Sequence, residues 1–133
     1  MRDIQQVLER WGAWVASGGD NIGYPAVAAG LKRLLPASGK SRPSCCDEDG
    51  LIVSSAASRL KKKDPYLHSL IELYYVRNIP VRAIADKHGI SHTLVLKRLQ
   101  AAEGFIDGCL AMLEVTLQMD RFVQREKVYE APK

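Results

Sequence analysis

The sequence contains few cysteines, and their spacing does not suit a metal site. Its three cysteines are Cys45, Cys46 and Cys109, and none belongs to a CxxC pair. An odd number of cysteines without zinc spacing predicts neither a disulfide framework nor a zinc centre. We therefore expect reduced structural thiols and no metal ion.

Long apolar runs are also missing. The uninterrupted apolar stretches are only a few residues long, whereas a membrane span needs about 20. The N-terminus, Met1-Arg2-Asp3-Ile4, lacks the basic-then-apolar layout of a secretory signal. These features predict a protein without membrane association, located in the cytoplasm.

No catalytic pattern is recognisable in the chain. His68, His88 and His92 lie outside any known cysteine or serine signature. A glycine-rich phosphate loop is absent as well. The sequence thus predicts a non-enzymatic protein that needs no cofactor.

The chain does contain a concentrated block of basic residues. It has 133 residues, of which 47% are apolar, enough for one globular domain. Between Arg59 and Arg98 there are nine Lys/Arg and three Asp/Glu, whereas the remainder has ten and twelve. Such a block favours a face that binds a polyanion, although it can equally serve solubility.

The spacing of apolar residues predicts an all-helical fold. We expect a compact domain of five or six helices within residues 1–126, a flexible loop at 36–46 and a frayed tail at 127–133. Trp11 and Trp14 lie on an apolar helical stripe and should belong to the core. Asp3 is expected to cap the first helix, and Ser44 with Asp47 resembles a capping box. The helices are expected at about 3–16, 25–35, 47–63, 65–77 and 81–87, followed by a long C-terminal helix that starts after residue 91.

Residues 80–100 follow the pattern of a helix-turn-helix. A short helix places Ala85 inward, Gly89 occupies a tight turn, and Ser91 caps a second helix whose residues Val95 and Leu99 face back. Arg98 stands where an inward apolar residue is common, so the rotation of the second helix is open to question. This motif predicts a domain that inserts its second helix into the major groove of DNA.

The second helix of this motif presents several polar residues outward. The first turn would meet base edges or phosphates, and the preceding helix would lie nearer the backbone. Lys61, Lys62 and Lys63 complement the dipole of their own helix, with phosphate contact as an additional role. The candidates for base contacts are Ser91, His92, Thr93, Lys97 and Gln100, and those for phosphate contacts are Arg82, Lys87, Arg98, Lys61, Lys62 and Lys63.

The long C-terminal helix is expected to continue towards Phe122, with a break near Gly104 or Gly108. Its apolar face should close the core against the N-terminal helix. Its last turns are candidates for contact with a partner protein. The residues in question are Met112, Met119, Phe122 and Val123.

Four segments of the sequence resemble a known protein family. They are MRDIQQVLERWGAWVAS at 1–17, SRPSCCDEDGLIV at 41–53, RLKKK at 59–63 and KRLQAAEGFIDGCLAML at 97–113. Together they resemble the late-gene antitermination protein Q of lambdoid phages, of the type found in phage 21 and in defective prophages. The resemblance extends over nearly the whole chain.

The resemblance implies a partner as well as a function. Such a protein binds double-stranded DNA beside the late promoter and engages host RNA polymerase, held with sigma at a promoter-proximal pause. It then travels with the enzyme, which reads through terminators. Whether a second protomer binds the same DNA is left open. Two alternatives are a helix-turn-helix repressor or sigma-like regulator without antitermination activity, and a protein–protein adaptor.

Overall fold

The computed structural model describes residues 2–19 and 42–124, and these residues form helices. The predicted helix at 25–35, most of the loop at 36–46 and the tail at 127–133 lie outside the described residues. Over the ranges 2–19 and 42–124 the only strand-like pairing is an isolated bridge between Arg2 and Gln124. The elements are α1 (Ile4–Ala16), α3 (Asp47–Lys63), α4 (Pro65–Ile71), the π-helical turn η2 (Glu72–Val76), α5 (Val81–His88), α6 (His92–Leu113) and the 3₁₀ turn η3 (Gln118–Phe122).

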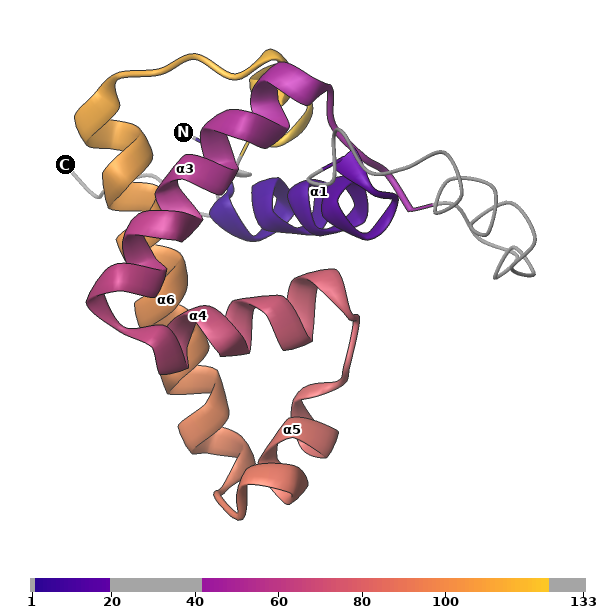
Figure 1. Cartoon of the computed structure of the whole chain (residues 1–133), viewed down its shortest axis with the longest axis vertical. Coiled ribbons are helices and arrows are strands. Elements are labelled where there is room, and N and C mark those ends of the chain that lie inside the picture. The colour runs from indigo at the N-terminus through magenta and orange to yellow at the C-terminus, as the bar shows by residue number, and fades with distance from the viewer. Residues whose placement is uncertain (1, 20–41, 125–133) are drawn as a thin grey trace, which may run out of the picture.

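The long helix α6 organises the domain. It runs along the longest axis of the molecule, with α1 and α3 around its C-terminal half, α4 across its middle and α5 beside its N-terminus (Figure 1). The buried side chains of these elements form one core cluster. Trp11 and Trp14 are each 3% exposed, which confirms that they belong to the core. Their indole N–H groups donate to Ser54 Oγ (3.0 Å) and Asp47 Oδ1 (2.8 Å).

The N-terminal ends of α1 and α3 are capped in different ways. Asp3 caps α1, as predicted, by accepting a hydrogen bond from the backbone N–H of Gln5 (3.0 Å). The expected capping box at Ser44 is wrong, because α3 begins at Asp47 and its N-cap is Cys46, which is extended. Its sulfur accepts from the N–H of Asp49. The body of this helix, Asp47–Lys63, matches the expected range.

The helix predicted at 65–77 exists but changes its winding. It is α-helical to Ile71 and then forms the π-helical turn η2. Arg42 donates to the carbonyl oxygens of Tyr75 and Val76 at the end of this turn. Asn78, with φ 60°, then redirects the chain.

The expected continuation of the C-terminal helix towards Phe122 is wrong. The helix α6 passes Gly104 and Gly108 without interruption and ends at Leu113, where Glu114 adopts a left-handed conformation (φ 54°). The buried Asp49 carboxylate then accepts the backbone N–H groups of Gln118 and Met119, both at 2.9 Å. These tertiary hydrogen bonds replace the helical ones that a longer α6 would make.

The segment that follows α6 folds back onto the start of the chain. Met119 and Val123 are buried there, so the expectation that they contact a partner is wrong, whereas Met112 and Phe122 are exposed. Arg2 donates to both carboxylate oxygens of Asp120 (2.8 and 2.9 Å). This closure ties the two ends of the described chain together.

The closure should weaken in acid. Although burial opposes ionisation of Asp120, hydrogen bonds from Arg2 and from the backbone N–H of Leu117 lower its pKa. A lowered folded-state pKa contributes stability above the unfolded-state pKa, and that stability is lost as the pH falls through the folded value. We expect urea unfolding to show a drop in stability below about pH 4. The drop should be smaller in Asp120→Asn but unchanged in Asp86→Asn, a control at an exposed position of α5. An equal drop in stability in the parent and in both variants would contradict this role of Asp120.

Candidate nucleic-acid interface

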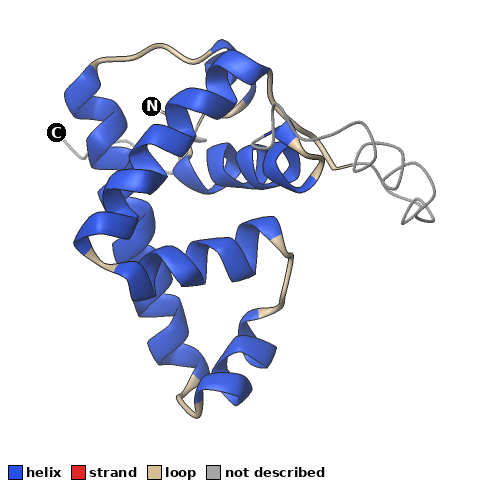
Figure 2. Ribbon diagram, in the orientation of Figure 1, coloured by secondary structure: helices blue, strands red, loops and turns tan. Residues whose placement is uncertain are grey.

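The helices α5 and α6 are joined by a tight turn at one end of the molecule (Figure 2). Gly89 ends α5 with φ 66°, in the left-handed region that glycine enters without strain. The N–H of Ile90 donates to the carbonyl of Ala85 (3.1 Å). Ser91 Oγ accepts from the N–H of Leu94 (3.0 Å) and so caps α6. The predicted helix-turn-helix is therefore confirmed, with α5 running one residue further than expected.

The two helices pack through the residues that the sequence predicted. Ile84 and Ala85 of α5 and Val95 and Leu99 of α6 are at most 4% exposed. Leu99, rather than Arg98, fills the inward position. The helix α6 therefore has an ordinary apolar contact with the rest of the domain despite the unusual residue at 98.

The five candidates for base contacts share one exposed surface. They occupy the first three turns of α6 and its cap, at positions that adjoin on a helix. Leu96, between them, is 40% exposed and adds an apolar side chain to this surface. Arg82 and Lys87 are exposed on α5. The exposed candidates on α6 and its cap are Ser91, His92, Thr93, Lys97 and Gln100.

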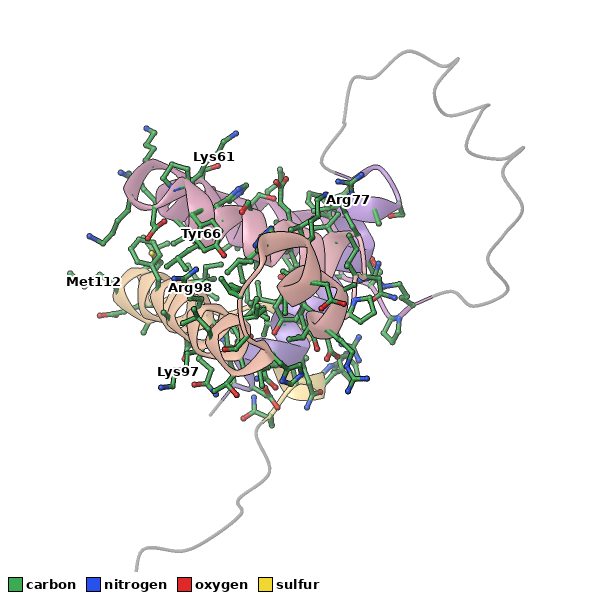
Figure 3. All side chains as sticks on the ribbon, turned by 90° about the horizontal axis from the view of Figure 1, so that it is seen from below. Lys61, Tyr66, Arg77, Lys97, Arg98 and Met112 are labelled. Carbon is green, nitrogen blue, oxygen red and sulfur yellow. The ribbon has the colours of Figure 1, made fainter. Side chains whose placement is uncertain are left out.

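Arg98 is held against an aromatic side chain. Its Nη1 donates to the hydroxyl of Tyr66 (3.1 Å), and its guanidinium lies 5.2 Å from the centre of that ring. The same hydroxyl is 3.1 Å from Nδ1 of His88. Tyr66 thereby links the start of α4, the end of α5 and the N-terminal part of α6. Figure 3 shows Tyr66 and Arg98 side by side at this end of the molecule.

Tyr66 was not found by sequence reasoning, and no local signal marks it. It lies outside the apolar stripe of its own helix, and its partners are 22 and 32 residues away. The guanidinium of Arg98 retains donors that Tyr66 does not use. Its contact with a phosphate remains a prediction.

The lysines at the end of α3 form a separate group. Lys61, Lys62 and Lys63 are exposed in the last turn of that helix. Viewed from the helix-turn-helix end, Lys61 and Lys97 point to opposite sides, with Tyr66 and Arg98 between them (Figure 3). The basic block of the sequence therefore does not present all of its charge on one side of the molecule.

The cysteines and the potential metal-binding side chains can be located in the described part of the chain. Over residues 2–19 and 42–124, His, Cys, Asp and Glu do not gather into a group of three that could hold a metal ion. The three cysteines are free thiols. Burial, followed by the nearby Asp49 carboxylate, raises the pKa of Cys45 to about 12, which keeps its thiol protonated.

An all-helical domain with an exposed helix-turn-helix at one end has the architecture of a helix-turn-helix DNA-binding protein. Residues 1–118 match the family model of phage antitermination protein Q. The chain belongs to this family. Within the part that the structure describes, none of the helices is long and apolar enough to span a lipid bilayer.

Curated relatives and solved structures agree with this assignment. The chain is 48% identical over 126 residues to the antitermination protein Q of Escherichia phage 933W, covering 95% of this chain and 88% of the relative. It is 47% identical over 120 residues to the prophage antitermination protein Q homolog QuuD of Escherichia coli (strain K12), covering 90% and 94%. The solved structure of transcription antitermination factor Q21 in complex with Q21-binding-element DNA is 21% identical, with a TM-score of 0.59 over 84% of this chain and 91% of that one. At this identity it shows a shared fold.

Proposed function

We propose that this protein is a phage antitermination factor that binds double-stranded DNA beside a late promoter through its helix-turn-helix and makes host RNA polymerase read through terminators. The observation that carries the proposal is the formed helix-turn-helix with an exposed polar stripe on α6, in a chain of the antitermination protein Q family. The role is regulatory rather than enzymatic, and its place is the cytoplasm of the host bacterium.

In this proposal the first turns of α6 lie in the major groove. His92, Thr93, Lys97 and Gln100 meet base edges, and the capping hydroxyl of Ser91 lies at the groove entrance. Arg82 and Lys87 approach the backbone from α5, where each phosphate contact adds salt-dependent affinity. Transcription antitermination factor Q21, which shares this fold, has been solved in complex with Q21-binding-element DNA, and this supports the DNA half of the proposal.

Family membership supports the part of the proposal that concerns RNA polymerase. A helix-turn-helix alone suits a repressor or a sigma-like regulator equally well, because it specifies DNA binding and no later step. The names of the relatives state antitermination. Antitermination is an action on transcribing RNA polymerase, and the family resemblance implies an enzyme held, with sigma, near the promoter.

Single-round transcription through a terminator tests the function. On a template with the cognate late promoter, we expect the purified protein to convert the terminated RNA into the readthrough product as the main species. A template with the promoter intact but the adjoining DNA scrambled is the matched control and should stay terminated. Specific DNA binding without any change in readthrough would favour a plain helix-turn-helix regulator, and readthrough on both templates would contradict a DNA-directed mechanism.

A further inference from the structure

A groove lies between α3 and α6, away from the helix-turn-helix. It encloses about 780 Å³. One wall is the last three turns of α6, with Gly104, Phe105, Gly108, Cys109, Met112 and Leu113, and the other is the middle of α3. Met112 is 85% exposed and Leu113 57%. In Figure 3, Met112 points away from the body of the domain.

The two glycines of this groove are not needed by the fold itself. A Cβ at Gly104 or Gly108 would meet nothing within 4 Å, so alanine would fit at either position. Glycine inside a helix costs about 1 kcal/mol relative to alanine. Because neither glycine has a side chain, the groove stays deep along two successive turns of α6. Such depth allows another chain to approach the backbone of α6 closely.

The charges around the groove indicate what fits there. Among the described residues that line it, Arg59 carries the only charge. Lys61, Lys62 and Lys63 follow in the next turn of α3 and are exposed. The groove is thus apolar along α6 and basic at the end where α3 terminates. An elongated apolar groove with one basic end suits a helix with an apolar face and acidic residues beside it.

We propose that the groove between α3 and α6 binds an amphipathic, acidic helix of a partner protein. Duplex DNA suits it less well, because its wall along α6 is apolar and offers phosphates no hydrogen-bond donor. Gly104 lies twelve residues beyond His92 on the same helix, a distance of about 18 Å. The domain can therefore hold DNA at one end of α6 and a protein at the other. The proposal stands independently of the function proposed above.

Peptide binding to the full chain tests the proposal. The probe is a fluorescent helical peptide with leucines at i, i+3, i+4 and i+7 and glutamates beside them, compared with the same peptide carrying lysine for each glutamate. By fluorescence anisotropy we expect the acidic peptide to bind at least about tenfold more tightly than the basic one. Arg59→Glu should reduce this preference. Equal binding of both peptides, or binding of neither, would overturn the proposal.

A variant that fills the groove provides the second arm. Gly108→Leu places a side chain in open space, so the helix should persist in circular dichroism, and affinity for the acidic peptide should fall at least about tenfold. Ala83→Leu, at an exposed position of α5, is the control and should bind as the parent does. If duplex DNA displaces the acidic peptide, or if sedimentation shows a dimer that Gly108→Leu abolishes, nucleic acid or a second copy occupies the groove and the proposal fails.

Discussion

Gly12→Ala is expected to destabilise the domain. The loss of stability should be larger than for the same substitution at Gly104 or Gly108 in α6. A Cβ at Gly12 would overlap the carbonyl oxygen of Tyr75 in η2. That oxygen belongs to the backbone and also accepts a hydrogen bond from Arg42, so neither side can move freely. Overpacking of this kind costs about 3 kcal/mol. In thermal unfolding we expect a melting temperature lower by about 10 °C.

Gly104→Ala is the matched control for that substitution. It adds the same methyl group to a helix and removes the same freedom from the unfolded chain, but its Cβ meets nothing within 4 Å. It should stabilise the protein by up to about 1 kcal/mol. The difference between the two variants therefore isolates the contact between α1 and η2. Equal melting temperatures would contradict the close approach of these elements.

Local patterns predicted those parts of the fold that depend on neighbouring residues. The apolar stripe of Trp11 and Trp14, the cap at Asp3 and the turn at Gly89 each need only a few adjacent positions to be recognised, and the structure confirms all three. The helix-turn-helix was predictable for the same reason. Its small, turn and apolar residues all lie within 21 positions, 80–100.

Contacts between distant residues account for most of the errors. The end of α6 depends on Asp49, which binds backbone groups 69 and 70 residues away. The position of Arg98 depends on Tyr66, 32 residues earlier. Helical periodicity carries no information about such pairs, so α6 was predicted too long and Tyr66 was missed. The same limit applies to the groove, whose two walls come from separate helices.

The candidate site, like the fold, combines features that neighbouring residues predict with features that depend on distant ones. The sequence predicted which residues of α6 face outward, because their spacing differs from that of Val95 and Leu99. It did not predict that Lys61 and Lys97 point in opposite directions (Figure 3). Charge counted along the chain therefore suggested one basic face, whereas the fold spreads these residues over more than one side of the molecule. Mutation of one lysine from each side separates their roles.

Lys97→Ala is expected to weaken binding to the cognate promoter DNA by about tenfold or more, equivalent to about 1–3 kcal/mol. Lys97 is exposed one turn beyond Thr93, within reach of the groove floor or wall. Its removal should leave the melting temperature unchanged because no described contact depends on it. Gel-shift titrations at several salt concentrations, on cognate and scrambled DNA, measure the loss. Unchanged affinity at every salt concentration would remove Lys97 from the interface.

The salt series also assigns the contact that Lys97 makes. Loss of a phosphate contact makes the negative slope of log affinity against log salt shallower by about 0.9. It weakens binding to cognate and scrambled DNA alike. Loss of a base contact instead lowers the ratio of the affinity for cognate DNA to that for scrambled DNA.

Lys61→Ala is the matched control from the end of α3. If DNA lies only against the helix-turn-helix, this variant keeps the parent affinity. A loss equal to that of Lys97→Ala would mean that nucleic acid covers both sides of the Tyr66–Arg98 pair, since the two lysines project away from each other.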